Sequence, residues 1–402
     1  MKLSFIKKQT RNFIEQQVLP FESQLALADS KAEKDINFLV KEAHKKGLWG
    51  QFFPEQWGGN IKRLNDYLTI GLQEGRSEFA PTIFGGLATV DAHMLNDYGS
   101  AFIKDTFLKS LSTGDITSAY GMTEPNQPGS IPATLSCQAK REGKTWRIDG
   151  EKWFICNATK ADYITVLACS EANAPLSNRL TMFVIPIEAD GCDLKGPMSI
   201  FGRQLGQGHF TFKNVIIDDE YRLGEIGQGL AIMHRRVGLG RLLRSIHWLG
   251  LAERCLELSY QRIHSDKGQR TRLGDKQLIR QHIYKSYSTI ETAKLLLSKA
   301  AKEYDKQNLT TITTNLAKIS ASKALCQASD SAIQIYGAEG VSDMTPLAAI
   351  SQVARTTRIL DGADEALINS VGHELLKNNH KNFEKVSTSH LLAKEKESEV
   401  CL

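Results

Sequence analysis

The sequence has few of the residues that build disulfide-bonded or metal-stapled proteins. Its seven cysteines among 402 residues are odd in number, scattered along the chain and never arranged as CxxC. This pattern predicts reduced thiols, an intracellular and cytoplasmic location, and no zinc site or other metal centre. No apolar run approaches the length that a membrane-spanning helix needs. The N-terminal residues also lack a continuous apolar segment with a cleavage site, so we expect neither a membrane span nor a secretion signal.

Common sequence signatures of catalysis are missing as well. The chain has no GxxxxGK[ST], no HExxH, no GxSxG and no GxGxxG after a strand, so it lacks four frequent phosphate-binding and catalytic motifs. Gly238-Leu-Gly240-Arg241 has no third glycine and lies in a helical pattern, which favours a helix–helix contact or a helix start. The net charge of +5 is mild. It would help to attract a polyanionic ligand such as a CoA-type phosphate or a nucleic acid, but it specifies neither. We expect no nucleic-acid partner.

The composition that remains is that of a soluble globular protein with several domains. Hydrophobic residues make up 41% of the chain and charged residues 24%, and this length suffices for two or three domains around a large core. The apolar spacing is helical over residues 1–117, alternates over 118–222 and is helical again over 223–376. The predicted fold class is therefore α+β multidomain: an N-terminal helical domain, a middle antiparallel β domain and a C-terminal helical bundle, followed by a polar tail at 377–402.

Short sequence patterns predict three local features: a turn, a buried helix and a helix cap. Asp149-Gly150 is a preferred two-residue hairpin turn, so we expect two strands to reverse there. The apolar and small residues from Phe79 to Leu95 predict one buried helix. Asp364 or Glu365 would cap the last helix and complement its dipole.

Three groups of residues are candidates for chemistry. The stretch from Ser118 to Asn157 gathers hydroxyl and aromatic residues on a β scaffold, which suits either an ordinary sheet edge or a flat ligand. Asp361 stands out because Gly362 after it lets backbone and ligand approach closely. The third group is basic, and it is either a solvated helix face or a set that faces a phosphate or orients a carboxylate. Its members are His234, Arg235, Arg236, Arg241 and Arg244.

Six segments of the sequence resemble one enzyme family in both order and spacing. They are YGMTEPNQPGS, GEKWFIC, LGEIGQGLAI, GLAERCLEL, AIQIYGAEGVS and ARTTRILDGADEA, and the similarity covers nearly all of residues 8–376. The chain resembles the acyl-CoA dehydrogenase family, and within it the branch whose catalytic base is an aspartate. The resemblance implies bound FAD, a C-terminal four-helix domain, and assembly as a homotetramer or homodimer.

The resemblance also implies roles for individual residues. For catalysis, it implies Asp361 as the base, Arg241 packed near that carboxylate, and Gly362 in substrate binding. For the cofactor, it implies Tyr120, Met122 and Thr123 on the strand that holds the flavin ring, Ser130 near the substrate and the flavin phosphate, Phe154 against the isoalloxazine, Cys156 near flavin N5, and Gln334 and Gly337 lent by a neighbouring subunit to the adenosine portion.

The implied reaction is α,β-dehydrogenation of an acyl thioester, from acyl-CoA to 2-enoyl-CoA. The carboxylate removes the α-proton while the β-hydrogen passes as hydride to flavin N5. Because the α-proton is weakly acidic, the thioester oxygen needs hydrogen bonds that strengthen as enolate charge develops. An electron-transferring flavoprotein or a similar acceptor would then take the electrons.

Some positions depart from the family pattern. Asp266 and Gln269 stand where the family has the arginine and phenylalanine of an Arg-x-x-Phe-Gly segment that contacts the FAD pyrophosphate, which weakens that contact unless a neighbouring cation takes over. Ile131 replaces an aspartate, and Cys156 replaces a hydroxyl residue with a weaker hydrogen-bonding group. Two alternatives therefore stay open: a catalytically silent member that acts as a binding or scaffold protein, and a dehydrogenase of a carrier-protein-bound acyl group.

Overall fold

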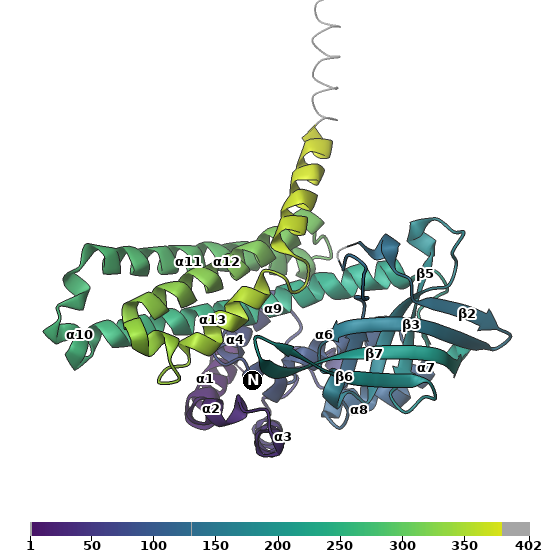
Figure 1. Cartoon of the computed structure of the whole chain (residues 1–402), viewed down its shortest axis with the longest axis horizontal. Coiled ribbons are helices and arrows are strands. Elements are labelled where there is room, and N and C mark those ends of the chain that lie inside the picture. Colours follow the sequence, from purple (N-terminus) through teal and green to yellow (C-terminus); the bar gives the residue numbers. More distant parts are fainter. Residues whose placement is uncertain (1, 130, 380–402) are drawn as a thin grey trace, which may run out of the picture.

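The computed structural model describes residues 2–129 and 131–379. Helices come first, strands follow between Ser118 and Leu223, and helices return from Gly229 onward. This order confirms the predicted fold class of helical, β and helical domains. Figure 1 shows the helical bundle at one side and the sheet at the other, with one long helix extending from the bundle to the sheet. Among the described residues, no helix is long and apolar enough to cross a membrane.

The N-terminal helices divide between the bundle and the sheet. One group buries its apolar residues with the C-terminal helices, and the other packs against the strands. The predicted single helix from Phe79 to Leu95 is wrong, because Gly85 adopts a left-handed conformation with φ 74° beside the Trp49 ring and breaks it in two. The helices are α1 (Leu3–Phe13), α2 (Glu22–Leu25), α3 (Ser30–Lys45), α4 (Leu64–Glu74), α5 (Ala80–Ile83), α6 (Gly86–Tyr98), α7 (Ala101–Ile103) and α8 (Lys109–Thr113).

The middle segment forms one twisted sheet in which most neighbours are antiparallel. The strands are β1 (Ser118–Gly121), β2 (Gln138–Glu142), β3 (Thr145–Ile155), β4 (Tyr163–Cys169), β5 (Leu180–Pro186), β6 (Cys192–Ile200), β7 (Arg203–Asp218) and β8 (Arg222–Leu223). Their order is β6-β7-β3-β2-β4-β5-β8, with β1 beside β4 in parallel. The ends of β1 and β3 therefore lie on the same sheet, although their residues are separated in the sequence.

The hairpin turn predicted at Asp149-Gly150 is wrong. β3 runs unbroken through both residues, and the chain reverses instead between Glu142 of β2 and Thr145 of β3. Gly150 marks a register shift in the pairing of β3 with β7, and a side chain there would lie only 2.7 Å from Cys137 Cα. Because β7 pairs with β3 on both sides of this point, the ladder keeps the strand extended despite the local turn preference.

The C-terminal helices form the bundle. They are α9 (Gly229–His264), α10 (Asp266–Arg270), α11 (Gln277–Asp305), α12 (Thr311–Tyr336) and α13 (Leu347–Thr357), followed by helical residues 364–379. Of the tail predicted at 377–402, residues 380–402 lie outside the described residues. The six cysteines within the described residues are free thiols.

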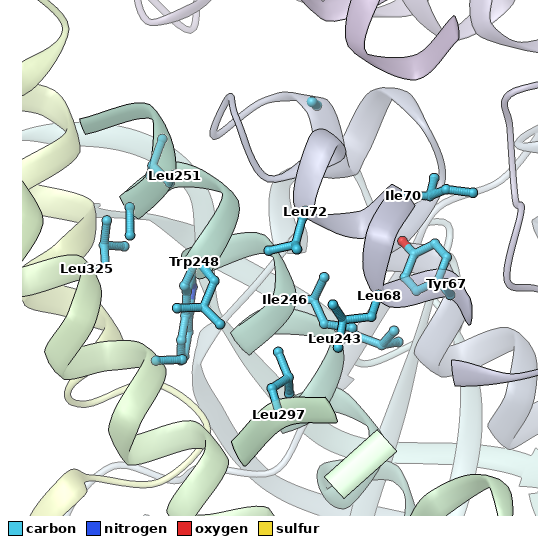
Figure 2. Close-up of a cluster of buried hydrophobic side chains, with 14 of the residues drawn as sticks. Tyr67, Leu68, Ile70, Leu72, Leu243, Ile246, Trp248, Leu251, Leu297 and Leu325 are labelled. Atoms are coloured by element: carbon cyan, nitrogen blue, oxygen red, sulfur yellow. The ribbon is translucent and has the colours of Figure 1, made fainter. Parts of the chain in front are cut away.

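One core joins the N-terminal helices to the bundle. Tyr67 and Leu68 of α4 pack with Ile246 of α9 and Leu297 of α11, as Figure 2 shows. The helices α4 and α9 approach so closely that a side chain at Gly250 would lie 2.2 Å from the carbonyl oxygen of Leu72. This packing fixes α9 against the N-terminal segment and so positions the polar side chains on its opposite face.

Candidate active site

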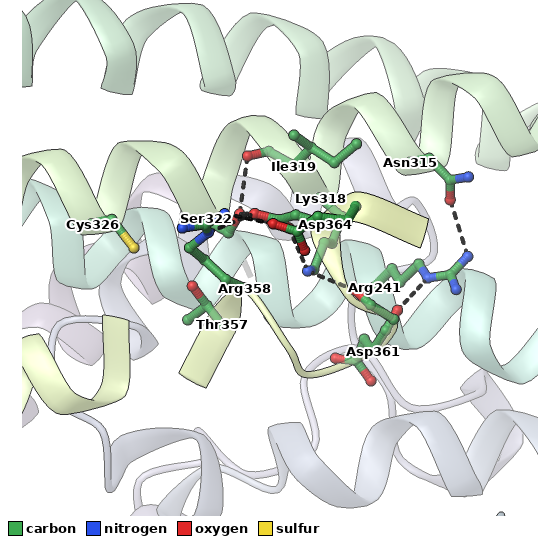
Figure 3. A network of polar contacts seen from close by, with 12 residues as sticks. Arg241, Asn315, Lys318, Ile319, Ser322, Cys326, Thr357, Arg358, Asp361 and Asp364 are labelled. Atoms are coloured by element: carbon green, nitrogen blue, oxygen red, sulfur yellow. Dashed lines mark hydrogen bonds and ion pairs between the residues drawn. The ribbon is translucent and has the colours of Figure 1, made fainter. Parts of the chain in front are cut away.

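The loop between α13 and the helical residues 364–379 presents Asp361. Asp361 and Gly362 have positive φ values of 56° and 102°, and this backbone conformation costs a non-glycine residue about 1–2 kcal/mol. Two cations hold the loop by its carbonyl oxygens. Arg241 Nε donates to Asp361 over 2.7 Å, and Lys318 Nζ donates to Gly362 over 2.9 Å (Figure 3). Strained residues that their surroundings hold in place cluster at functional sites.

Asp364 lies behind this loop as a buried anion. Its side chain is 1% exposed and accepts hydrogen bonds from Lys318 over 2.8 Å and from Ser322 over 3.0 and 3.1 Å. These contacts correct the predicted capping role, because α12 binds the carboxylate instead of the helix's own first turn. Sequence reasoning missed Lys318 and Ser322. The available signal was a lysine set among small and apolar residues in NLAKISAS, since a buried charge needs a partner.

The Asp361 carboxylate points away from Asp364 (Figure 3) and faces Arg244 instead. Arg244 Nε lies 3.0 Å from Asp361 Oδ2, and the two side chains are 31% and 21% exposed. This contact is an ion pair without hydrogen-bond alignment, so Oδ2 is a buried oxygen with no hydrogen-bond partner. Asp361, and after it Cys156, raise the pKa of Arg244 despite the desolvation of the guanidinium. Arg244 thus connects the carboxylate with Cys156, just beyond the end of β3.

The basic residues of α9 make different contacts. Arg241 contacts the backbone of Asp361 and the side-chain oxygen of Asn315 at 3.1 Å, and burial lowers its pKa against the attraction of Asp361. Arg236 pairs with Asp91 at 2.7 Å. Sequence reasoning selected Arg241 as the arginine near the carboxylate and named Arg244 only as a member of the basic group, without a contact to Asp361. Its position three residues further along the helix places it on the same face, which was the available signal.

A second surface, the β wall, faces this loop across Arg244. We define it by Tyr120, Met122, Thr123, Phe154 and Cys156. Thr123 joins its two halves: its hydroxyl donates to the carbonyl of Trp153 over 2.6 Å, and its own carbonyl accepts from the Trp153 N–H over 3.0 Å. The Phe154 ring is 46% exposed at a φ of 51°. Ser130, also predicted here, lies outside the described residues.

The β wall contains two further features. Arg236 stacks on the Tyr120 ring at 3.6 Å, and the buried Tyr120 hydroxyl has no hydrogen-bond partner. Beneath the wall, the fully buried Lys152 pairs with Glu124 at 2.7 Å and donates to the carbonyl of Met122 over 3.1 Å. Sequence reasoning missed this pair.

Gln334 and Gly337, the remaining predicted cofactor residues, lie far from the Asp361 loop. Both are exposed at the end of α12. Asn315, which contacts Arg241, lies near the start of the same helix, and its separation from Gln334 corresponds to about 28 Å at 1.5 Å per residue. Within one chain these residues are not part of the site. They lie beside α10 instead, because Lys267 reaches Glu339 over 2.6 Å.

Comparison with known protein families assigns the whole architecture to one class. The "Acyl-CoA dehydrogenase, N-terminal domain" matches residues 3–115, the "Acyl-CoA dehydrogenase, middle domain" matches 119–215, and the "Acyl-CoA dehydrogenase, C-terminal domain" matches 227–376. The chain belongs to the acyl-CoA dehydrogenase family, a family of oxidoreductases whose cofactor is FAD.

Individual relatives agree with this assignment. The chain is 32% identical over 382 residues to "Acyl-CoA dehydrogenase family member 11" of Mus musculus, covering 90% of this chain and 48% of that protein. It therefore spans about half the length of that relative. It is 31% identical over 365 residues to "Probable acyl-CoA dehydrogenase FadE2" of Mycobacterium tuberculosis, covering 89% of each chain.

Solved structures share the fold. A candidate acyl-CoA dehydrogenase from Mycobacterium abscessus superposes with a TM-score of 0.85 at 27% identity, covering 94% of this chain and 98% of that one. The FAD complex of PigA has a TM-score of 0.81 at 21% identity, covering 93% and 97%. At that identity the PigA likeness concerns the fold alone.

Proposed function

We propose that the protein catalyses the FAD-dependent α,β-dehydrogenation of an acyl thioester, with Asp361 as the base that removes the α-proton. The observation that carries the proposal is the position of the Asp361 carboxylate, 3.0 Å from Arg244 and linked through it to Cys156 of the β wall. A carboxylate on a strained, anchored loop therefore faces a surface suited to a flat cofactor. The three domain matches support the same reaction class.

The β wall fits the isoalloxazine of FAD in two respects. The exposed Phe154 ring is an apolar face to stack on, and the buried Tyr120 hydroxyl is an unpaired polar atom that needs a partner. We propose that these residues, with Met122 and Thr123, hold the ring and that Cys156 lies near its N5. When bound, FAD would accept the hydride that leaves the acyl β-carbon.

The Asp361 loop supplies the proton chemistry. Asp361 would take the α-proton at a carboxylate oxygen, and its backbone N–H would donate to the thioester oxygen, with Gly362 against the substrate. Because Arg241 and Lys318 hold the two carbonyls of this loop, the N–H groups need not reorient as negative charge develops. The same anchors decide how far the carboxylate reaches, which matters because aspartate is one methylene shorter than glutamate.

The proposal includes partners. The substrate is acyl-CoA, or an acyl group on a carrier protein in a close variant of the proposal, and the electron acceptor is an electron-transferring flavoprotein or similar protein. Assembly as a homotetramer or homodimer is supported by Gln334 and Gly337, whose exposed position suits contact with the FAD of a neighbouring subunit. We place the protein in the cytoplasm.

Replacing Asp361 by Asn tests the role of the base. We expect the variant to keep FAD but to lose substrate-driven bleaching of the flavin absorbance by about 10²-fold or more, since a positioned base contributes that much to proton transfer. The matched control is Glu365→Gln, which changes an exposed carboxylate on the adjacent helix. Anaerobic stopped-flow absorbance with acyl-CoA measures both. Undiminished bleaching in Asp361→Asn would show that Asp361 is not the base.

A catalytically silent binding protein is the second candidate, and one observation favours it. Lys267, one of the cations that stands beside Asp266, is already paired with Glu339, so it is not free to replace the missing arginine at the FAD pyrophosphate. The colour of the purified protein separates the two candidates. Protein that is colourless and stays so after FAD is added is silent, whereas yellow protein that acyl-CoA bleaches is a dehydrogenase.

A further inference from the structure

The side chains around Asp361 include one more cation than anions, so they carry a net positive charge. Arg236 is neutralised by Asp91 at 2.7 Å, and Lys318 by Asp364 at 2.8 Å. Arg241 donates only to neutral acceptors, the Asp361 carbonyl and the Asn315 amide oxygen. Among the described residues, Asp361 is therefore the anion that Arg241 and Arg244 share, with a smaller attraction between Arg244 and Asp91, which is already paired with Arg236.

Arg244 is the cation that faces this carboxylate, but no hydrogen bond holds it there. Its guanidinium is more than two-thirds covered, and a guanidinium has five N–H donors in a fixed fork. Its contact with Asp361 is close, at 3.0 Å, but has no hydrogen-bond alignment. Its other neighbour is the thiol of Cys156, which is a weak hydrogen-bonding group. A covered arginine with most donors unused is suited to receive an anionic oxygen.

Catalysis leaves the two arginines without a neighbouring carboxylate charge, because Asp361 becomes neutral when it takes the α-proton and the negative charge would pass to the substrate and, with the hydride, to the flavin. An anionic oxygen on the substrate would restore the balance. It would also draw the guanidinium off Asp361 and leave the base free to reach the α-hydrogen. A neutral acyl chain has no anionic oxygen for Arg244 to bind. Arg244 would therefore stay paired with Asp361 and compete with the α-proton for its carboxylate.

We propose that Arg244 binds an anionic oxygen of the acyl group, so that the preferred substrate is an acyl thioester with a carboxylate or comparable anionic group a few bonds from its α-carbon. This inference rests on the proposed function and adds a substrate class to it. The short reach follows from the geometry: the base must lie within about 3 Å of the proton it removes, and Arg244 lies 3.0 Å from the same carboxylate.

The experiment compares two acyl-CoA probes of equal chain length, glutaryl-CoA and valeryl-CoA. Calorimetry gives their dissociation constants for the wild-type holoenzyme, Arg244→Met, Arg244→Lys and the control Arg235→Met, which changes an exposed arginine of the same helix that faces Asp97. We expect the wild type to bind glutaryl-CoA at least about tenfold more tightly, the size of one charge-assisted hydrogen bond. Arg244→Met should reduce the preference to about one, Arg244→Lys should retain part of it, and Arg235→Met should leave it unchanged.

Two outcomes would overturn the inference: equal binding of both probes by the wild type, or a preference that survives Arg244→Met. Bleaching of the flavin by valeryl-CoA tests the proposed function separately. If valeryl-CoA bleaches the wild type but glutaryl-CoA has no advantage, only the inference about Arg244 fails. If neither probe bleaches the flavin but the binding preference follows Arg244, the dehydrogenase assignment fails and the anion site stands.

Discussion

Asp361 and its neighbours show how single residues divide the work of one site. Arg241 holds the loop by a carbonyl oxygen, while Arg244, one helical turn further along, faces the carboxylate itself. Lys318 does two things at once, because it holds the Gly362 carbonyl and neutralises Asp364. The position of the Asp361 carboxylate, the proposed base, therefore depends on a lysine that does not contact it.

Replacing Lys318 by Met tests this dependence. The change removes the shorter of the two ion pairs of the buried Asp364 and leaves only its contact with Arg358 at 3.4 Å. Breaking a buried ion pair destabilises a protein by about 3–5 kcal/mol. Denaturant unfolding should show this loss, and stopped-flow bleaching should slow because the loop loses an anchor. Lys323→Met alters an exposed lysine on the same helix, and its effect should stay within about 0.5 kcal/mol. Equal stability of the two variants would contradict the structural role of the pair.

At the scale of elements, the β wall depends on the pairing of Glu124 with Lys152. Glu124 follows β1 and is 1% exposed, and its carboxylate also accepts hydrogen bonds from the Ser136 N–H and hydroxyl, each over 2.6 Å. Burial alone would raise the pKa of Glu124, but Lys152 and Ser136 outweigh it and hold that pKa below its ordinary value. The ionised pair therefore stabilises the turn that carries Met122 and Thr123.

The depressed pKa of Glu124 predicts acid sensitivity. The stabilising contribution of this carboxylate is complete above its unfolded-state pKa of about 4.3 and is lost as pH falls through the lower folded-state value. Glu124→Gln should be less stable than the wild type at pH 7, and its stability should fall less steeply between about pH 5 and 3. Thermal melts across this range, with Glu142→Gln as the exposed control, measure the difference. Parallel curves for wild type and Glu124→Gln would contradict it.

At the scale of the whole molecule, the Asp361 site and the α10 region lie at different ends of the bundle. Glu339 binds both Arg262 and Lys267, and Asp275 lies within ion-pair distance of Arg272 and Arg280. Among the described residues this leaves Arg270 as the unpaired cation of the segment that departs from the family pattern. We expect Arg270 to take over the pyrophosphate contact with the FAD of a neighbouring subunit.

Replacing Arg270 by Ala tests whether Arg270 makes the pyrophosphate contact in place of the family's arginine. It should weaken FAD binding by about tenfold or more, the size of a charge-assisted hydrogen bond. Arg272→Ala removes the same charge from a neighbouring arginine that is already paired and should leave FAD affinity unchanged. Titration of the apoprotein with FAD, followed by flavin fluorescence, gives both values. Equal affinities in the two variants would show that Arg270 does not compensate.

The sequence by itself determined the order of helical, β and helical segments, because apolar spacing reports locally which face of an element is buried. It also singled out Asp361 and Gly362 as candidates, since a glycine beside a carboxylate is a local signal. Local signals misled where distant partners compete. Asp149-Gly150 is extended because β7 pairs across it, and Asp364 is held by Lys318, which lies far from it in the sequence.

Only the tertiary structure decided which charges meet. Arg241 and Arg244 are the same residue type three positions apart on α9. Their side chains leave the helix in different directions, so one contacts a backbone oxygen and the other faces the carboxylate. The pairs of Lys318 with Asp364 and of Lys152 with Glu124 follow from burial in a shared interior, where each charge requires a partner. Ion pairs between elements far apart in the chain have no sequence period, which is why the pattern predicted the fold and only the structure showed which side chains meet at the candidate site.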